Sequence, residues 1–425
     1  MDPRLAAHRI LTEVRRGRFA GHVAERVLPQ VAPKGRGLTL EIAYGCLRLR
    51  ERLDTRILAL TDRPRHRIDP EVLDWLRMGV YELTELRTPD HAAVHETVKQ
   101  ARRRMDAGGA GFINAVLRAA TSASRDPFPD RTDPLAYLTS YGSHPAWLVR
   151  RWLNRWGVEA VTALVEHGNS RPPVVLQSLE ADDALPPLPD TVALRRLDGW
   201  PGAYELECGS PAMALAHVRA VIQDPAASAV VHYLGDGFSP PVYDACAAPG
   251  TKTMVVAWRT NGVVIAADLS LRRLRRVAPA ADRLGLTVRG VVADAREPAV
   301  ASAATVLADV PCTGTGVLRR RPDARWRIEE AGLQELVGIQ REILDESARI
   351  VEKGGTLLYS TCSLEREENE MQVASFLDRN RDFRRDPNLA AGLPDGCLTL
   401  DGDLFVRPWI TGTDGAYAAR LRRVR

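Results

Sequence analysis

From residue 242 onward, the sequence alternates short runs rich in β-branched residues with stretches whose apolar residues have helical spacing. The runs are VYDACA, GVVIAAD, VRGVVAD, TVLADVP and GTLLYSTC. This alternation predicts a doubly wound parallel sheet, because each strand must return over a helix before the next one can run parallel to it. In such a sheet the carboxyl ends of the strands share one edge, which is where ligands bind.

Acidic residues stand where four of the predicted strands end. They are Asp244, Asp268, Asp294 and Asp309. A single aspartate in such a place is often only a helix N-cap, and that alternative stays open for each of them. Four in succession favour a shared crevice at the carboxyl edge of the sheet.

Two cysteines follow neighbouring predicted strands, Cys312 after the fourth and Cys362 after the fifth. A buried cysteine is most often a small apolar filler. Their matched placement, each followed by small polar residues, favours a functional role, and both thiols are expected to face the crevice.

The segment after the first strand predicts the site of a nucleotide-like cofactor. It is a tight turn that leads into a helix, so backbone amides can approach a ligand near a helix N-terminus. It is neither a P-loop nor a GxGxxG turn. Asp268 follows Asp244 at about the offset of an acidic residue that binds ribose hydroxyls. The turn consists of Cys246, Ala247, Ala248, Pro249, Gly250, Thr251 and Lys252.

The first 125 residues predict an all-helical domain, since apolar residues recur at helical spacing, as at Val72, Leu76, Val80 and Leu83. The polar, proline-rich segment TSASRDPFPDRTDP that starts at Thr121 predicts a linker. We interpret residues 140–222 as a small α+β connector and residues 223–425 as the α/β domain.

Composition narrows the class of protein. With 45% hydrophobic and 26% charged residues among 425, the chain is globular in composition rather than disordered. It has no apolar run long enough to span a membrane and no signal-peptide pattern at its start. Its six cysteines lack metal-binding spacing. We therefore expect a soluble, cytoplasmic monomer that binds no metal and no membrane.

The N-terminal part carries a surplus of positive charge. Residues 1–125 hold 23 lysines and arginines against 15 aspartates and glutamates. Such a surplus suits a polyanionic partner, although many arginine-rich proteins have one without that role.

Five ordered segments resemble motifs of the RNA 5-methylcytosine methyltransferases known as the RsmB/Sun/NOP group: DACAAPGTKT, ADLSLRRLRR, VVADARE, LADVPCTGTGVLRRRPDARW and LLYSTCSLEREENE. IAYGCLRLRERLD and GFINAVLRAA resemble the NusB-like RNA-binding domain fused to bacterial members that modify small-subunit ribosomal RNA. The resemblance implies an all-α N-terminal domain, a class I (Rossmann-like) methyltransferase domain and S-adenosylmethionine as cofactor.

The resemblance also implies roles for three residues in catalysis. Carbon 5 of cytosine is a poor nucleophile, so a thiolate must first add to carbon 6, and in the family this is the cysteine that matches Cys362. Cys312 would help to release the product. Asp309 would hydrogen-bond the cytosine edge near N3 and border the cofactor.

For the cofactor, the resemblance implies that the 246–252 turn carries it, with Asp268 at the ribose and Asp294 near the adenine. Lys252 matches a lysine of the family, whereas Thr251 stands where the family usually has a second glycine. That replacement adds a side chain where backbone approaches the cofactor.

A cluster of arginines follows the Cys312 motif. We predict that it contacts RNA phosphates, and a solvated basic loop is the alternative. The residues are Arg319, Arg320, Arg321 and Arg325.

The sequence therefore predicts S-adenosylmethionine-dependent methylation of carbon 5 of a cytosine in ribosomal RNA, with the 16S RNA of the small subunit as the expected partner. The same chemistry on transfer RNA or large-subunit ribosomal RNA stays open as an alternative. A third alternative is a NusB-like RNA-binding protein without enzymatic activity.

Overall fold

The computed structural model describes residues 1–425 except 123–126, 181–184, 261 and 390–391, so part of the predicted linker lies outside the described residues. The chain forms two compact units. The helical unit holds Met1–Ser170 and Leu318–Arg327, and the sheet unit holds Arg171–Val317 and Ile328–Arg425. The ten-residue segment Leu318–Arg327 thus belongs to the helical unit although both of its neighbours in sequence belong to the sheet unit.

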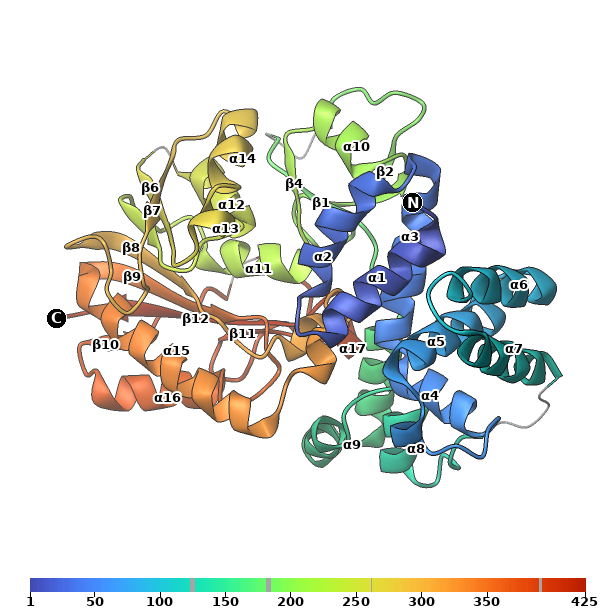
Figure 1. The fold of residues 1–425 in the computed structure, drawn as a ribbon. Helices are drawn as coiled ribbons and strands as arrows, with labels where there is room; N and C mark the ends of the chain where they lie inside the picture. The colour runs from blue at the N-terminus through green and yellow to red at the C-terminus, as the bar shows by residue number, and fades with distance from the viewer. Residues whose placement is uncertain (123–126, 181–184, 261, 390–391) are drawn as a thin grey trace. The chain divides into compact units, whose positions relative to one another are not determined.

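The helical unit is built from the helices drawn from blue to teal in Figure 1. Aspartates fix the starts of several of them. The Asp2 carboxylate accepts a hydrogen bond from Arg4 N at 2.9 Å at the start of α1, and Pro3 occupies the first helical position, where no N–H is needed. The helices are α1 Pro3–Arg15, α2 Ala20–Val27, α3 Pro33–Arg48, α4 Arg50–Leu58, α5 Pro70–Thr84, α6 Asp90–Ala101, α7 Ala107–Ser122, α8 Pro134–Ser140 and α9 Ala146–Asn169.

The helical unit is longer than the predicted domain of residues 1–125, because α8 and α9 belong to it. Arg52 donates from Nε to Tyr141 O at 2.7 Å, and its guanidinium lies 4.0 Å from the centre of the Tyr141 ring. Ser143 Oγ accepts from Glu51 N at 3.1 Å. These contacts tie the segment after the predicted linker to α4, so only residues 171–222 of the predicted connector lie in the sheet unit.

Those connector residues form a small antiparallel sheet with the strand order β2-β3-β1-β4. This agrees with the predicted α+β character. The elements are β1 Val175–Ser178, β2 Ala193–Arg196, β3 Ala203–Cys208, α10 Pro211–His217 and β4 Ala220–Ile222.

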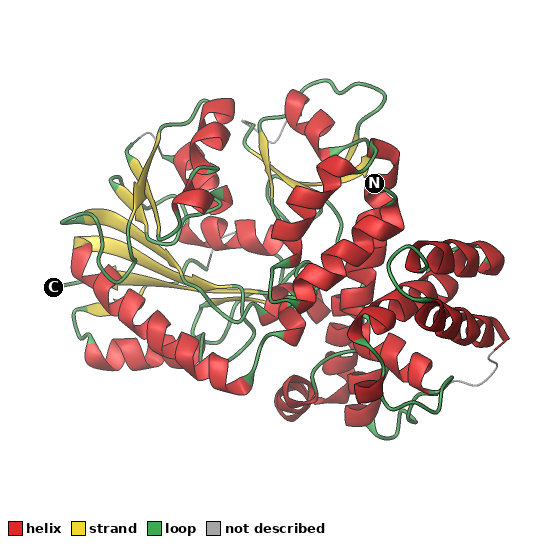
Figure 2. Ribbon diagram, viewed as in Figure 1, coloured by secondary structure: helices red, strands yellow, loops and turns green. Residues whose placement is uncertain are grey.

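The main sheet confirms the predicted doubly wound architecture. Its strand order is β10-β12-β9-β8-β5-β6-β7, and β5 to β9 all run parallel. β12 is antiparallel to β9 and also pairs with β10 and β11, which the sequence did not predict. Figure 2 shows these strands in yellow. They are β5 Val242–Asp244, β6 Val264–Asp268, β7 Val288–Val292, β8 Ala303–Asp309, β9 Val351–Thr361, β10 Phe383–Arg385, β11 Leu404–Val406 and β12 Ala416–Arg423.

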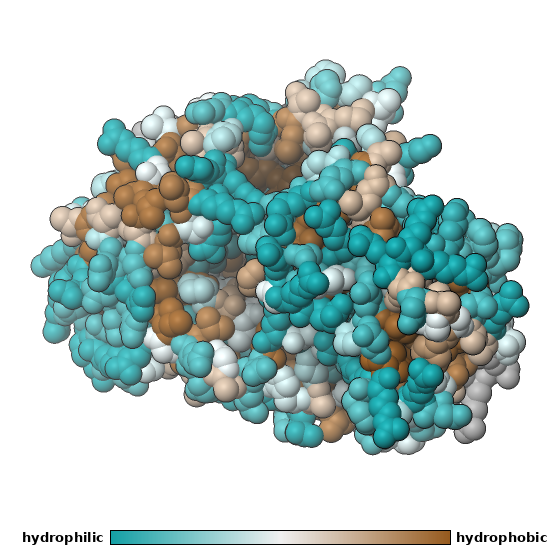
Figure 3. All heavy atoms as spheres, viewed as in Figure 1, coloured by the Kyte–Doolittle hydropathy of each residue, from teal (hydrophilic) through white to brown (hydrophobic). Residues whose placement is uncertain are grey.

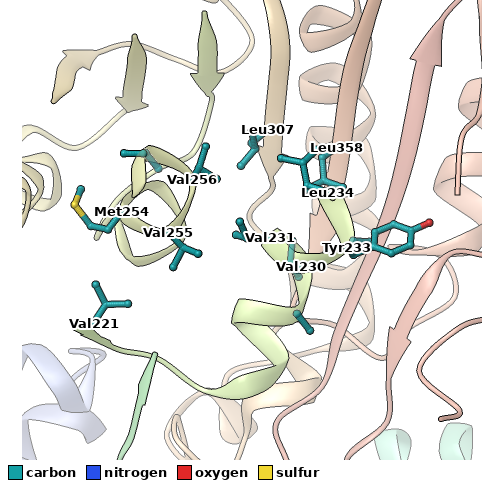
Figure 4. Close-up of a cluster of buried hydrophobic side chains, with 14 of the residues drawn as sticks. Val221, Val230, Val231, Tyr233, Leu234, Met254, Val255, Val256, Leu307 and Leu358 are labelled. Atoms are coloured by element: carbon teal, nitrogen blue, oxygen red, sulfur yellow. The ribbon is translucent and has the colours of Figure 1, made fainter. Parts of the chain in front are cut away.

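Helices cover both faces of this sheet, with α11 and α12 on one side and α15 and α16 on the other (Figure 1). Val231 of α11, Val256 of α12, Leu307 of β8 and Leu358 of β9 meet in a buried apolar cluster (Figure 4). The helices are α11 Pro225–Leu234, α12 Thr251–Arg259, α13 Leu271–Leu274, α14 Val277–Leu284, α15 Glu330–Ile350, α16 Glu370–Arg379 and α17 Pro408–Thr411.

The surface is mixed in character. On the face drawn in Figure 3, hydrophilic residues predominate and hydrophobic ones form scattered patches. In the described parts of the chain, every helix is too short or too polar to cross a membrane.

Candidate active site

The parallel strands bring the predicted residues to one edge of the main sheet. Asp244, Asp268 and Asp309 are the last residues of β5, β6 and β8, and Cys362 directly follows β9. Asp294 lies two residues beyond the end of β7. Because β5, β6, β8 and β9 are neighbours in the sheet, their carboxyl ends form one continuous site.

The 246–252 turn joins β5 to α12 and is tied to the next strand by a hydrogen bond from Ala247 N to Ala267 O at 2.8 Å. Gly250 is in the left-handed region, at φ +101°, and a Cβ there would lie 3.0 Å from Val277 Cγ2. Glycine is therefore required at this point. Thr251 is the first residue of α12, so its side chain stands at the helix N-terminus.

Asp244 is a buried carboxylate with one unused acceptor. Oδ2 accepts from Thr253 Oγ1 at 2.7 Å, whereas Oδ1 is buried and has no partner among the described residues. Burial raises the pKa of Asp244 to about 7, against the opposing effect of the Thr253 hydrogen bond. A buried acceptor without a donor fits a site whose bound ligand supplies a donor or a positive charge.

Asp268 and Asp294 are both held by arginines. Asp268 Oδ1 accepts from Ser270 N at 2.7 Å and from Arg273 Nη2 at 2.8 Å. The hydrogen bonds that it makes within the described residues all use Oδ1, so Oδ2 keeps its capacity for a ligand hydroxyl. Asp294 pairs with Arg296 at 2.7 Å, and hydrogen bonds from Arg296 lower the pKa of Asp294.

Asp309 is oriented through both of its oxygens. Oδ2 accepts from Lys252 Nζ at 2.8 Å, and Oδ1 accepts from Ser360 Oγ at 2.8 Å. Burial alone would lower the pKa of Lys252, but the charge and hydrogen bond of Asp309, together with the nearby Cys362 and Asp244, outweigh it and the pKa is raised. Lys252 is therefore a permanent cation beside Cys362.

The two cysteine side chains meet. Cys312 Sγ lies 3.3 Å from Cys362 Sγ, a distance that suits an S–H···S hydrogen bond. The bond to Cys362, burial and the negative charges of Cys362 and Glu368 together raise the pKa of Cys312 well above its ordinary value. Either sulfur could donate across this distance, and the raised pKa favours Cys312 as the thiol that keeps its proton.

A buried carboxylate anchors the loop that carries Cys312. Glu368 is completely buried and accepts from Thr313 N at 2.8 Å, from Thr313 Oγ1 at 2.5 Å and from Gln340 Nε2 at 2.9 Å. Gln340 Nε2 also donates to Pro311 O at 2.9 Å. The residues on either side of Cys312 are thereby fixed.

The backbone around Cys362 is packed too closely for a side chain. Gly316 N donates to Cys362 O at 3.0 Å, and Gly316 O accepts from Gly415 N at 2.8 Å. A Cβ on Gly316 would lie 2.8 Å from Cys362 O and 2.8 Å from Gly415 Cα. These two glycines let three loops meet beside Cys362.

Of the four arginines predicted to contact RNA, Arg325 has a structural place instead. Its side chain is completely buried in the helical unit. Nη1 donates to Arg48 O at 2.7 Å and to Ser143 O at 2.9 Å, and Nη2 donates to Gly168 O at 2.9 Å. Arg48 and Gly168 lie at the carboxyl ends of α3 and α9, whose carbonyls favour a positive charge. The prediction that Arg325 contacts RNA is therefore wrong: its side chain binds the carboxyl ends of two helices.

Arg319 is also buried in the helical unit, and its carbonyl oxygen accepts from Arg48 Nη2 at 3.4 Å. Arg320 is partly buried and Arg321 is exposed. Of the four predicted arginines, Arg320 and Arg321 are therefore the ones whose side chains are accessible to solvent.

Sequence reasoning did not single out Glu368, Ser360, Gly316 and Gly415. Glu368 and Ser360 lie in the segment LLYSTCSLEREENE, whose cysteine alone was assigned a role. The Thr-Gly-Thr-Gly run that contains Gly316 was a signal of close backbone approach.

Comparison with protein families matches both units. Residues 238–422 match the family described as 16S rRNA methyltransferase RsmB/F, and residues 1–122 match the NusB family. The probable ribosomal RNA small subunit methyltransferase B of Bacillus subtilis is 33% identical over 413 residues, which cover 93% of this chain and 92% of the relative. The ribosomal RNA small subunit methyltransferase B of Cronobacter sakazakii is 32% identical and covers 98% of this chain and 97% of the relative.

Solved structures agree in fold. The crystal structure of PH0851 aligns with a TM-score of 0.79 at 22% identity and covers 100% of this chain and 99% of that chain. NSun6 from Pyrococcus horikoshii with SFG aligns with a TM-score of 0.53 at 19% identity and covers 66% of this chain and 98% of that chain. Together with the sequence relatives, these matches confirm the predicted resemblance: the chain belongs to the RsmB/F family of 16S ribosomal RNA methyltransferases, and in this chain a NusB-family domain precedes the S-adenosylmethionine-dependent methyltransferase domain.

Proposed function

We propose that this methyltransferase transfers a methyl group to carbon 5 of a cytosine in 16S ribosomal RNA through a covalent bond to Cys362. The observation that carries the proposal is the 3.3 Å approach of Cys312 Sγ to Cys362 Sγ beside the Lys252–Asp309 pair. Two thiols in one site, one of them held protonated, suit a reaction in which one sulfur bonds to the substrate and must later leave.

Cys362 acts as the nucleophile. Its thiolate adds to carbon 6 of the cytosine, and the electron pair released at carbon 5 then attacks the methyl group. The Lys252 ammonium attracts the negative sulfur and so favours the thiolate form. Because the pKa of Cys312 is raised, we assign the thiolate of the pair to Cys362.

Asp309 stabilises the ring during the addition. A proton held between its carboxyl group and N3 of the cytosine neutralises the charge that develops when the thiolate adds. Lys252 and Ser360 hold the two carboxylate oxygens in place, so the group needs little reorganisation.

Cys312 assists the release of the product. After the proton on carbon 5 has left to a base, the bond between carbon 6 and sulfur breaks, and the double bond of the ring forms again. The Cys312 S–H donates a hydrogen bond to the departing Cys362 sulfur. Without it the covalent adduct is expected to persist.

S-adenosylmethionine supplies the methyl group as a sulfonium. We assign its binding to the 246–252 turn, with Asp268 Oδ2 at the ribose and Asp294 near the adenine. The unpaired Asp244 Oδ1 fits a cationic ligand, since a positive charge would satisfy this buried carboxylate.

The target cytosine must be unpaired or flipped out, because the reacting carbon is inaccessible within a helix. The helical unit, together with Arg320 and Arg321, would bind the surrounding phosphates. A ribosomal RNA substrate agrees with the expected cytoplasmic location.

The test traps the adduct. Cys312→Ala protein is incubated with S-adenosylmethionine and separately with 16S, 23S and transfer RNA, and the products are resolved by denaturing electrophoresis. A band of protein-linked 16S RNA is expected, and it should be absent when Cys362→Ala is added to Cys312→Ala. Cys208→Ala, which removes an exposed cysteine, is the matched control and should leave no trapped band.

Bisulfite sequencing of 16S RNA treated with the wild-type protein then locates the methylated carbon. A trapped band with transfer RNA alone would show that transfer RNA, rather than 16S RNA, is the substrate. No methyl transfer to any RNA by the wild-type protein would overturn the enzymatic assignment.

A further inference from the structure

The helical unit contains a cavity of about 540 Å³ that the methyl-transfer chemistry does not use. Its lining comes from α1, α3, α4, α5, the loop between α4 and α5, and the segment Leu318–Arg327, all of which belong to the helical unit. Leu11, Val14, Leu47, Ile68 and Leu73 supply apolar surface. This volume lies within the range of small-ligand sites, which is about 300 to 1,000 Å³.

Five arginines line the same cavity, and buried carboxylates hold them. Asp74 accepts from Arg15 Nε at 3.1 Å and from Arg77 Nη1 at 3.0 Å. Asp54 pairs with Arg65 at 2.8 Å and with Arg77 at 2.7 Å. Arg50 pairs with Glu51 at 3.2 Å, and Arg327 lies 3.8 Å from Asp323.

Four of the five arginines of this network are accessible to solvent, whereas Arg77 and most of the carboxylates are not. The side chains of Arg15, Arg50, Arg65 and Arg327 are 27 to 40% exposed. Those of Asp54, Asp74 and Asp323 are at most 7% exposed. The accessible part of the cavity is therefore basic, and its guanidinium groups are already oriented before any ligand binds.

An aromatic group completes the site. Trp326 lines the cavity, and the Arg50 guanidinium lies 4.0 Å from the centre of its ring. Its indole N–H donates to Leu47 O at 2.6 Å, which fixes the ring plane. Aromatic rings beside arginines are the surfaces on which single-stranded nucleic acids stack their bases.

We infer that this cavity binds one unpaired nucleotide of an RNA strand, with its phosphate on the exposed arginines and its base against Trp326 and the apolar lining. The inference rests on the proposed function, because RNA is the polyanion that such a methyltransferase meets. Arginine forks bind phosphate through paired hydrogen bonds, and the apolar part of the lining suits a base better than a second charged group.

The test uses the full chain and a short fluorescein-labelled single-stranded RNA. Arg15→Gln together with Arg65→Gln removes two exposed cations, while Asp74 and Asp54 each keep Arg77 as partner. We expect the Kd to rise about tenfold at physiological salt, and the slope of log K against log salt to fall by about 1.4, the value for two phosphate contacts on a single strand.

Arg102→Gln together with Arg103→Gln is the matched control, since both side chains are exposed elsewhere in the helical unit. It should change the Kd far less. Equal losses in the two double variants, or no loss in either, would overturn the inference. Uridine monophosphate serves as competitor, and displacement of the RNA at similar phosphate concentrations would assign the cavity to free nucleotides and overturn RNA binding there.

Photo-cross-linking of the same RNA carrying 4-thiouridine provides a second readout. A cross-linked peptide that contains Trp326 supports the inference, and cross-links confined to other peptides contradict it. Methyl transfer by wild-type protein is measured alongside. If the protein methylates 16S RNA but neither binding test gives the expected result, the cavity is not an RNA site and the proposed function still holds. If the protein binds RNA in the cavity but never methylates it, the proposed function alone is wrong.

Discussion

Glu368 accepts a hydrogen bond from the backbone N–H of Thr313 at 2.8 Å, and this contact links the segment after Cys362 to the residue that follows Cys312. The thiols of Cys312 and Cys362 are thus both positioned by one buried carboxylate. Tyr359 OH donates to Glu368 O at 2.6 Å, so the backbone of the same residue is fixed to β9 as well. The relationship explains how two loops that are 50 residues apart in sequence keep their sulfurs 3.3 Å apart.

Replacing this carboxylate should therefore disturb both stability and thiol chemistry. Glu368→Ala leaves the Thr313 N–H and the Gln340 amide without their acceptor, and we expect the free energy of unfolding to fall by about 3 kcal/mol in urea denaturation. Glu368→Gln removes a negative charge that raises the pKa of Cys312, so this pKa should fall.

The pKa change is measured as the pH dependence of Cys312 alkylation, followed by mass spectrometry of its peptide. Faster alkylation at alkaline pH is expected for Glu368→Gln than for wild type. Asp378→Asn is the control, because Asp378 is an exposed carboxylate on α16, the helix that begins two residues after Glu368. An unchanged alkylation profile in Glu368→Gln would show that the charge does not act on Cys312.

Much of this site follows from the alternation of strands and helices. Parallel strands must be apolar along their whole length when helices cover both faces, so the residue at which polarity begins marks the carboxyl edge. Asp244, Asp268 and Asp309 are all found there. The approach of Cys312 to Cys362 then depends on β8 and β9 being neighbours, which the strand order supplies and the sequence pattern alone does not.

Other features depend on tertiary contacts that leave no local pattern. The burial of Arg325 requires free carbonyls at the ends of α3 and α9, which are far from it in sequence. Glu368 is one of four glutamates in the segment EREENE, and nothing in that local pattern marks it as the one that binds Gln340 and Thr313. The extension of the helical unit beyond residue 125 has the same origin, since α8 is held to α4 by the contacts of Arg52.

Asp244 should make the stability of the protein depend on pH. Its pKa rises from 3.8 to about 7 on folding, so its contribution to stability is largest below pH 4 and is lost as pH rises toward 7. Asp244→Asn removes this cost, which is at most about 4 kcal/mol. We expect a higher Tm than wild type at pH 8, and little difference at pH 4.

The same variant should bind S-adenosylmethionine about tenfold more weakly or worse, since a cationic ligand loses its carboxylate partner. Isothermal titration calorimetry measures this affinity. Asp236→Asn, which changes an exposed carboxylate, should alter neither quantity. A variant that is more stable at pH 8 yet binds the cofactor normally would remove Asp244 from the cofactor site.

Gly316 should tolerate no side chain. Alanine would place a Cβ 2.8 Å from both Cys362 O and Gly415 Cα, so the loops around Cys362 must separate. We expect Gly316→Ala to lower the free energy of unfolding by about 1 to 3 kcal/mol and to abolish adduct formation.

Gly338→Ala is a matched control in α15, because a Cβ there meets nothing within 4 Å. It should stabilise the protein by about 0.5 to 1 kcal/mol, since alanine is the better helix former. Equal behaviour of the two variants in thermal unfolding and adduct trapping would contradict the close packing at Gly316.

A substitution of Arg325 distinguishes a structural role of its side chain from an RNA contact. Its guanidinium bonds to the carbonyl oxygens of Arg48, Ser143 and Gly168, and burial together with nearby arginines lowers its pKa. Arg325→Lys keeps a positive charge but lacks the planar fork, so it cannot reach all three carbonyls at once. We expect a loss of about 3 kcal/mol in the free energy of unfolding and faster hydrogen exchange of the amides in Leu318–Arg327.

Arg321→Lys, at an exposed site of the same segment, should change neither the free energy of unfolding nor the hydrogen exchange. If Arg325→Lys instead left the exchange unchanged and weakened the binding of RNA, the side chain would be a phosphate ligand, as its sequence first predicted.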